Sequence, residues 1–195
     1  MKRKSVIRDS APSKPSRATS TAKVKADKSS NAASNAVKTS RLHPVPAITV
    51  LSRELRQRRE RAKFSALLEQ PALINEMAVV KLVQERLPVE VIDHFLTEGV
   101  TQQEVDKLIA PRRTQTHRRA NAERLTVDES DRAVRLARVV AQTESVFDNK
   151  IKAMHWLRQP MKRFEGRSPI DMLETDVGSR LVEEALVRID EGFFA

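Results

Sequence analysis

The most informative part of the sequence is WLRQPMKRFEGRSPIDMLETDVGSRLVEEALVRIDEGFFA, residues 156–195. It contains Ser168 followed by Pro169, which is a strong helix start. A serine hydroxyl can cap a free amide, and proline at the first helical position loses only a donor that had no partner. The pair predicts a short helix through Leu173, and Thr175 predicts the start of a second one.

The second predicted helix carries one apolar stripe. Its apolar residues recur at three- and four-residue spacings, as expected of a helix that buries one face. The stripe consists of Val177, Leu181, Val182, Ala185, Leu186 and Ile189. Gly192 stands where a left-handed residue commonly ends a helix, so the helix is predicted to stop there.

Beyond Gly192 the sequence ends in Phe193, Phe194 and Ala195. Chain ends are usually polar, yet two of the six phenylalanines stand here, directly after a predicted helix cap. In one interpretation both rings pack onto the core of their own domain. In the other interpretation the tail inserts into a partner protein. The residues alone leave both interpretations open.

The order and spacing of these residues resemble the C-terminal domain of MbcA/ParS/Xre antitoxins, the partners of RES-domain toxins in bacterial type II toxin–antitoxin pairs. The residues that carry the resemblance are Trp156, Leu157, Pro160, Phe164, Gly166, Ser168, Pro169, Leu173, Thr175, Gly178, Val182, Leu186, Ile189 and Gly192. It continues upstream through residues 125–132 and more weakly to about Arg61, so it covers about two thirds of the chain.

The resemblance implies a mode of action. The C-terminal tail would enter and block the active site of an NAD-consuming toxin, and the implied toxin-binding residues are Arg188, Asp190, Glu191, Gly192, Phe193, Phe194 and Ala195. It also implies homodimers that assemble further with the toxin.

The composition predicts an all-α protein. The 195 residues include four Gly and no Tyr, whereas strand-rich proteins depend on aromatic and β-branched residues and on Gly at turns. There is no Cys, which excludes disulfides and thiolate metal sites and fits a reducing compartment such as the cytoplasm. No apolar run reaches the roughly 18 residues that a membrane span needs.

The net charge of +10 is unevenly distributed. Residues 1–48 hold eleven Lys or Arg against Asp9 and Asp27, whereas the remaining 147 residues hold 25 basic and 24 acidic side chains. The segment 1–48 has no aromatic residue and no apolar period, which predicts a disordered basic arm that accounts for any nonspecific polyanion binding. Its composition also resembles a mitochondrial transit peptide, which its length and lysines disfavour.

Three helices are predicted before residue 100. The first spans Arg53–Leu68, and its apolar residues are so sparse that we expect an exposed helix. The second spans Ile74–Leu87, with core-facing residues Ile74, Met77, Val80, Leu82 and Val83. The third spans Val89–Leu96 and is expected to bury Val91, Ile92 and Phe95.

A helix-turn-helix layout follows. Thr101 and Glu104 form a capping box, in which each side chain satisfies one backbone amide at the same helix start. Ala110-Pro111 breaks this helix, and a short, very basic helix succeeds it, as in DNA readers with two helices across a tight turn. The predicted DNA-binding residues are Arg112, Arg113, Thr114, Gln115, His117, Arg118 and Arg119. A basic helix can also be merely a solvated surface, so the pattern alone leaves this open.

The resemblance supports DNA binding, because the family has an Xre-like helix-turn-helix that represses its own operon. The family pattern places an apolar residue at position 115, where this sequence has Gln. If that side chain packs the second helix onto the domain, Gln115 is expected to loosen the docking and thereby weaken operator binding.

Thr126 and Glu129 form a second capping box, which opens a long helix to about Phe147. Asp148 is predicted to cap the next helix, Ile151–Leu157. Trp156 in that helix is interpreted as a core anchor of the C-terminal domain rather than as a platform for a stacked ligand.

The sequence offers no constellation for catalysis. His43, His94, His117 and His155 are isolated from one another, and the four glycines cannot form a phosphate-binding loop. We therefore expect no catalytic residue, metal, cofactor or small-molecule substrate, and no membrane contact.

The predicted organisation is a basic arm (1–48), a helical Xre-like helix-turn-helix region (49–124) and a toxin-binding domain (125–195). Two functions fit it. One is an antitoxin of a RES-domain toxin that also binds operator DNA. The other is a stand-alone transcription regulator whose C-terminal helices dimerise it.

Overall fold

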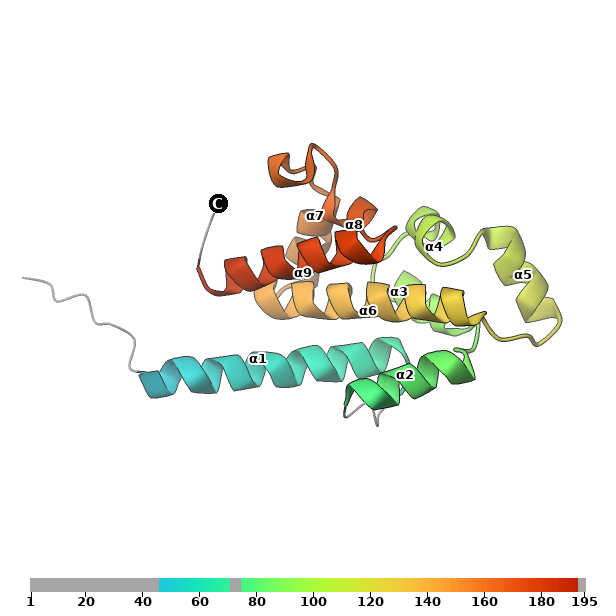
Figure 1. Cartoon of the computed structure of the whole chain (residues 1–195), viewed down its shortest axis with the longest axis horizontal. Coiled ribbons are helices and arrows are strands. Elements are labelled where there is room, and N and C mark those ends of the chain that lie inside the picture. The colour runs from blue at the N-terminus through green and yellow to red at the C-terminus, as the bar shows by residue number, and fades with distance from the viewer. Residues whose placement is uncertain (1–45, 71–74, 193–195) are drawn as a thin grey trace, which may run out of the picture. The chain divides into compact units, whose positions relative to one another are not determined.

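The computed structural model describes residues 46–70 and 75–192, and helices are the only regular secondary structure in these ranges (Figure 1). The elements are α1 (Pro46–Leu67), α2 (Glu76–Glu85), α3 (Val91–Thr97), α4 (Gln102–Leu108), α5 (Arg112–Ala120), α6 (Val127–Phe147), α7 (Lys150–Arg158), the 3-10 turn η1 (Lys162–Phe164), α8 (Pro169–Met172) and α9 (Asp176–Asp190). The all-α prediction is confirmed for this part of the chain. None of its helices is long and apolar enough to cross a membrane. The predicted disorder of the arm concerns residues outside the described ranges, except for 46–48.

Helix α6 is the centre of the fold, with α1 packed along one side and α9 along another (Figure 1). It begins at the predicted capping box: Thr126 N donates to Glu129 Oε2 at 2.7 Å, and Glu129 N donates to Thr126 Oγ1 at 3.2 Å. Its inner face includes the buried residues Ala133, Leu136, Ala137, Val140 and Ala141. The capping box therefore predicted the start of this helix correctly, and the helix ends at Phe147 as expected.

Helix α1 is longer and less exposed than the sequence suggests. It begins at Pro46, inside the segment assigned to the basic arm, rather than at Arg53. Its C-terminal end enters the core, because α1 packs along α6, and Leu67 and the following Leu68 are almost completely buried. Leu55 is still 50 % exposed, so the prediction of an exposed helix is wrong only at the C-terminal end of α1.

Helix α2 buries a different face from the predicted one. Val79 and Leu82 are buried, but Met77 is 73 % exposed and Val80 is 45 % exposed. Apolar residues stand on two faces of this short helix, and contact with α6 selects the face that contains Val79. The helix starts only at Glu76, where Asn75 Oδ1 accepts a hydrogen bond from the third amide.

Helix α3 is close to its prediction, since Val91, Ile92 and Phe95 are buried. Helix α7 differs at its start. Asp148 adopts a left-handed conformation (φ 48°) that ends α6, and Asn149 caps α7 instead, accepting a hydrogen bond of 2.9 Å from Lys152 N.

Trp156 on α7 belongs to the core of the C-terminal region, as predicted. Its half-buried ring lies 5.7 Å from the ring of Phe147, measured between centroids, and packs against the buried apolar cluster. The neighbouring Leu157 is fully buried, whereas Ile151 at the start of the helix is 80 % exposed.

The predicted caps of α8 and α9 are present. Ser168 caps α8 with Pro169 at its first position, and Thr175 Oγ1 accepts a hydrogen bond of 3.0 Å from Gly178 N at the start of α9. The predicted stripe on α9 is only half correct, however. Val182, Ala185 and Leu186 are buried, but Val177 is 68 % exposed and Leu181 is 44 % exposed.

Small residues explain this difference. Gly178 and Ser179 take the inward positions at the start of α9 and are buried. A Cβ atom on Gly178 would lie 2.0 Å from the carbonyl oxygen of Met172, so α8 and α9 approach too closely here for a larger side chain. The larger Val177 is therefore left on the outside.

Candidate functional site

Two parts of the fold hold the residues predicted to be functional. The first is the pair α4 and α5, joined by a tight turn. Helix α4 has the predicted capping box, with Thr101 N donating to Glu104 Oε2 at 2.7 Å. Helix α5 follows Pro111 and has no side-chain cap at its N-terminus.

Gln115 fixes α5 to this turn. Its side chain is only 2 % exposed and donates to the carbonyl oxygen of Ala110 at 2.6 Å and to Asp106 Oδ1 at 2.9 Å. It also accepts a hydrogen bond of 3.2 Å from Gln102 Nε2. Gln115 thus occupies the packing position that the family pattern gives to an apolar residue. Its hydrogen bonds, in place of apolar contacts, hold α5 against α4 and the turn. Its side chain does not lie on the outer face with the basic residues.

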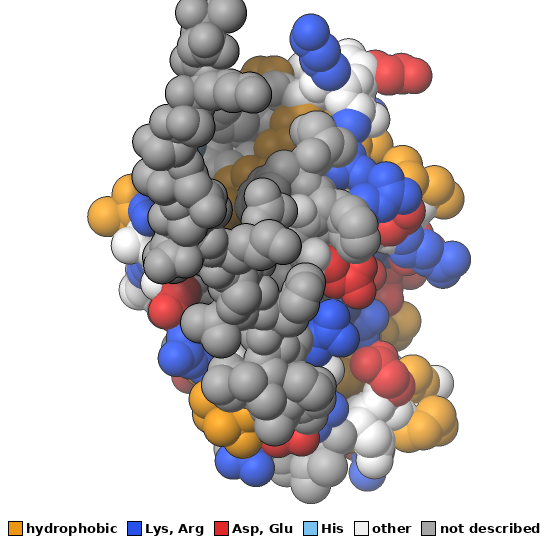
Figure 2. All heavy atoms as spheres, turned by 90° about the vertical axis from the view of Figure 1, so that its left-hand side faces the viewer, with side chains coloured by type: hydrophobic (Ala, Val, Ile, Leu, Met, Phe, Trp, Pro, Cys, Tyr) orange, Lys and Arg blue, Asp and Glu red, His pale blue; other side chains and the backbone are white. Residues whose placement is uncertain are grey.

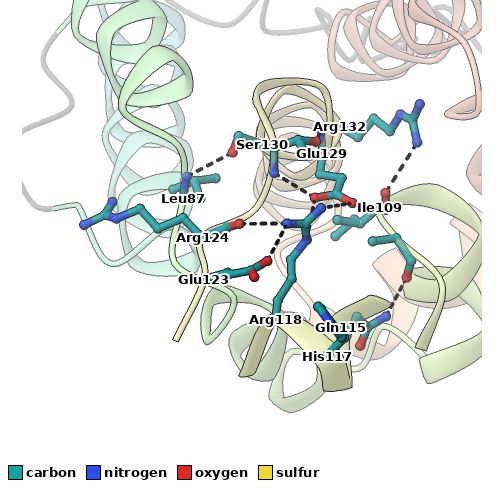
Figure 3. Close-up of polar contacts among 12 residues, drawn as sticks. Leu87, Ile109, Gln115, His117, Arg118, Glu123, Arg124, Glu129, Ser130 and Arg132 are labelled. Carbon is teal, nitrogen blue, oxygen red and sulfur yellow. Dashed lines mark hydrogen bonds and ion pairs between the residues drawn. The ribbon is translucent and has the colours of Figure 1, made fainter. Parts of the chain in front are cut away.

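Arg118 is also turned inward, as Figure 3 shows. Its side chain is 16 % exposed, and Nη2 donates to Glu129 Oε1 at 3.2 Å. Nη1 donates to the carbonyl oxygen of Arg124 at 3.2 Å, and Glu123 forms a further ion pair at 3.5 Å. Because Glu129 belongs to the capping box of α6, Arg118 joins the end of α5 to the start of the central helix.

The same corner holds other long-range contacts, of which Figure 3 shows the hydrogen bond between Leu87 and Ser130. Leu87 N donates to Ser130 Oγ at 2.9 Å, and Arg124 Nη1 donates to the carbonyl oxygen of Arg86 at 2.6 Å. These bonds join the chain after α2 to the start of α6. Their partners are about forty residues apart, so no local sequence pattern announces them.

The outer face of α5 contains the remaining predicted residues. Arg112, Arg113, His117 and Arg119 are exposed, and Thr114 is half-buried. Arg119 forms an ion pair of 2.6 Å with Asp93 of α3. Within the described residues, the side chains of Arg112 and Arg113 make no hydrogen bond or ion pair. This face is therefore open, basic and held by the inward contacts of Gln115 and Arg118.

The second part is the C-terminal end of α9. Gly192 has a φ of 83°, and its amide donates to the carbonyl oxygen of Ile189 at 3.0 Å, as expected for a left-handed residue after a helix. Arg188 is exposed and pairs with Glu184 one turn earlier, and Glu191 is exposed. The predicted toxin-binding residues Phe193, Phe194 and Ala195 lie outside the described residues.

Asp190, unlike the exposed Arg188 and Glu191, is turned toward another part of the chain. Its carboxylate forms an ion pair with Arg56 of α1, and its side chain is 26 % exposed. Asp190 therefore faces another helix of the same chain. Sequence reasoning missed Arg56, because it stands in a generally charged helix far from the C-terminal residues in sequence.

Ion pairs join α4 to the elements that precede α9. Arg158 of α7 donates to Glu104 at 2.7 Å, and Lys107 of α4 pairs with Asp171 at 2.7 Å and Glu174 at 2.6 Å. The hydrogen bonds from Lys107 and Ser168 lower the pKa of Asp171 below its ordinary value of 3.8. The helix-turn-helix is thus held against α7 and α8.

The described histidines are dispersed. His94 pairs with Glu69 at 2.9 Å, His117 lies beside Asn121, and His155 lies beside Gln159. No three His, Asp or Glu side chains gather as potential metal ligands in the part of the chain that the structure describes.

Comparison with known proteins identifies both parts. Residues 142–192 match the antitoxin Xre/MbcA/ParS C-terminal toxin-binding domain. Residues 78–138 match the antitoxin Xre-like helix-turn-helix domain. The first match includes α7 to α9, and the second includes α3 to α5 together with the first half of α6.

Three curated relatives agree with these matches. Antitoxin Xre of Pseudomonas putida is 38 % identical over 134 residues, which cover 68 % of this chain and 84 % of that protein. Antitoxin Xre of Yersinia enterocolitica is 36 % identical over 86 residues, covering 44 % of this chain and 58 % of that protein. The Prs ADP-ribosylating antitoxin of a Sphingobium species is 36 % identical over 85 residues, covering 39 % of this chain and 54 % of that protein. The chain belongs to the Xre/MbcA/ParS family of antitoxins and combines a helix-turn-helix domain with a C-terminal toxin-binding domain.

Proposed function

We propose that this antitoxin neutralises a RES-domain toxin by placing its C-terminal tail, Gly192–Ala195, in the active site of that toxin. The target follows from the family resemblance, in which RES-domain toxins consume NAD. The observation that carries the proposal is the position of the helix end. The buried face of α9 is made by Val182, Ala185 and Leu186, so the helix is anchored well before Gly192 ends it.

The chemistry of the tail suits insertion into a concave site. Two phenylalanine side chains entering a cleft would each contribute about 1.5–3 kcal/mol of apolar burial. The exposed Arg188 and Glu191 on the preceding turn would stand at the rim of that cleft. Charged groups at the rim of an interface orient the partners more than they strengthen the complex.

We infer a binding role without catalysis. The described histidines each have a different neighbour: Glu69 for His94, Asn121 for His117 and Gln159 for His155. The contribution of the antitoxin would therefore be occlusion of the toxin. We place both proteins in the cytoplasm, where the toxin would meet its NAD substrate.

The second part of the proposal is autoregulation through α5. Arg112, Arg113 and His117 form an open basic face, and the first amides of α5 have no side-chain cap, which leaves them to hydrogen-bond a phosphate. A homodimer, as the family resemblance implies, would present two such helices to the half-sites of an operator. A stand-alone transcription regulator would use the same face but would need no toxin.

Co-expression tests the proposal. The full-length antitoxin is produced together with the RES-domain protein encoded beside its gene, and cell survival and co-purification are measured. We expect survival and a stable complex. Cells that die although both proteins are made, together with failure to co-purify, would contradict the antitoxin assignment for this toxin and favour the stand-alone regulator.

A further inference from the structure

Helix α1 lies outside both segments that match the family, residues 78–138 and 142–192. It is nevertheless bound to several elements of both. Three basic side chains at spacings of three and four residues form ion pairs with carboxylates on different elements. Arg56 pairs with Asp190 of α9, Arg59 with Asp148 after α6, and Lys63 with Glu144 of α6 at 3.1 Å and with Glu98 after α3.

The two halves of α1 are held differently. Its C-terminal end is anchored by the buried Leu67 and Leu68. Nearer its N-terminal end, the side chains of Leu51 and Leu55 are 61 % and 50 % exposed. Two polar contacts bind the following turn: Ser145 Oγ donates to the carbonyl oxygen of Arg56 at 3.0 Å, and the Arg56 guanidinium pairs with Asp190.

A groove of about 240 Å³ lies between this half of α1 and the end of α9. Its lining includes Arg53, Gln142, Val146, Val187 and Glu191. Figure 2 looks at this end of the molecule, where basic and acidic side chains lie interspersed. The Arg56–Asp190 ion pair therefore bridges two helices that a shallow groove otherwise separates.

A second pair of charges between α1 and α9 does not attract the helices. Burial raises the pKa of Glu60 on α1, the carboxylate of Glu183 on α9 raises it further, and Arg61 and Arg138 lower it. The Arg56–Asp190 ion pair, in contrast, joins α1 to the end of α9.

We propose that α1 braces the toxin-binding end of α9 and that Arg56 is the residue that positions its last turn. This inference rests on the proposed role of the tail, because Asp190 precedes Phe193 by only three residues. A last turn held in one orientation lets the tail bind with a smaller loss of conformational freedom. Arg56 would raise affinity for the toxin without touching it.

The expected effect is modest and measurable. Partly exposed ion pairs change an equilibrium by up to about fivefold. Arg56→Ala should therefore weaken binding of the neighbouring RES-domain protein by two- to fivefold, on the order of one exposed ion pair, and Arg56→Glu should weaken it further because like charges then face each other. Arg59→Glu is the matched control, since it breaks an ion pair of the same helix whose partner, Asp148, is not on α9.

Amide hydrogen exchange in the free antitoxin tests the brace without any toxin. Arg56→Glu should speed the exchange of the amides of residues 187–192, Arg59→Glu should not, and the charge swap Arg56→Glu with Asp190→Arg should restore slow exchange. If wild-type antitoxin does not bind the RES-domain protein, the proposed target fails while the exchange result still decides the brace.

Two results would overturn the proposal. One is exchange at residues 187–192 that is unchanged in Arg56→Glu or that the charge swap leaves fast. The other is an equal loss of toxin affinity in Arg56→Glu and Arg59→Glu, because α1 would then act only through overall stability.

Discussion

Gln115 donates a hydrogen bond of 2.6 Å to the carbonyl oxygen of Ala110, and this bond closes the turn between α4 and α5. Ala110 itself is 1 % exposed, so water does not supply an alternative partner easily. The side-chain amide of Gln115 therefore has hydrogen-bond partners although it is buried: its nitrogen holds the turn and also donates to Asp106.

Replacing this residue by an apolar one should destabilise the protein. In Gln115→Leu the carbonyl oxygen of Ala110 and the carboxylate of Asp106 lose a donor, and a buried acceptor without a partner costs about 1–3 kcal/mol. Thermal unfolding measures the change, with the exposed Arg113→Ala as the control. A Gln115→Leu protein that unfolds at a higher temperature than the wild type would show that apolar packing alone suffices here.

The arginines of α5 should divide into two functional groups. Arg118→Ala removes the partner of Glu129, and hydrogen bonds to charged groups contribute about 1.5–3 kcal/mol, so the melting temperature should fall. The double variant Arg112→Ala, Arg113→Ala should keep its melting temperature but bind its own promoter fragment more weakly. Each lost phosphate contact should lower the slope of log affinity against log salt by about one.

Measuring these variants in one binding assay shows whether DNA binds to the outer face of α5 or elsewhere on the chain. Promoter binding that survives in the double variant at wild-type affinity would exclude the outer face of α5 and move the site elsewhere in the chain.

Gly178 should not tolerate a methyl group. The Cβ of Gly178→Ala would lie 2.0 Å from the carbonyl oxygen of Met172, so the backbone of α8 or α9 must move. Overpacking of this kind costs about 1–3 kcal/mol. Denaturant unfolding measures the loss, and Arg180→Ala, an exposed position on the same helix, is the control. Equal stability of the two variants would mean that the contact between α8 and α9 is looser than described.

The carboxylates of Glu60 and Glu183 should make stability depend on pH in an unusual direction. Burial raises the pKa of both side chains above 4.5. A carboxyl whose pKa is raised on folding contributes stability in acid, and that contribution is lost as the pH rises through the folded-state pKa. Glu183→Gln should therefore raise the melting temperature near neutral pH, and the gain should shrink in acid.

Glu54→Gln, an exposed position on α1, is the control for this series. A Glu183→Gln protein that is less stable than the wild type near neutral pH would contradict this expectation. It would show that the charge of this carboxylate stabilises the fold, for example through its attraction to Arg138.

The sequence predicted the helix starts well because capping is local. Thr101, Thr126, Ser168 and Thr175 each stand within three residues of the amide that they bind, so the signal is contained in one short stretch. The resemblance also identified the family correctly, since its residues recur over a long, ordered pattern.

Other features depend on contacts that are distant in the sequence. The outward positions of Met77 and Val177 follow from how α2 and α9 pack, because each helix has apolar residues on more than one face. The pairs Arg118–Glu129 and Arg56–Asp190 join different helices. Nothing in the sequence around Arg118 or Arg56 therefore indicates that this arginine forms an ion pair within the fold. The inward turn of Gln115 likewise becomes visible only when Asp106 and Ala110 are placed around it.

We propose that the tail inhibits the toxin while the rest of the chain folds without it. The measurement is made on one truncated protein that lacks Phe193, Phe194 and Ala195, with thermal unfolding and inhibition of NAD consumption by the RES-domain protein recorded together. We expect an almost unchanged melting temperature and a loss of inhibition, because the buried face of α9 ends before Gly192. A truncated protein that is folded and still inhibits the toxin completely would contradict it.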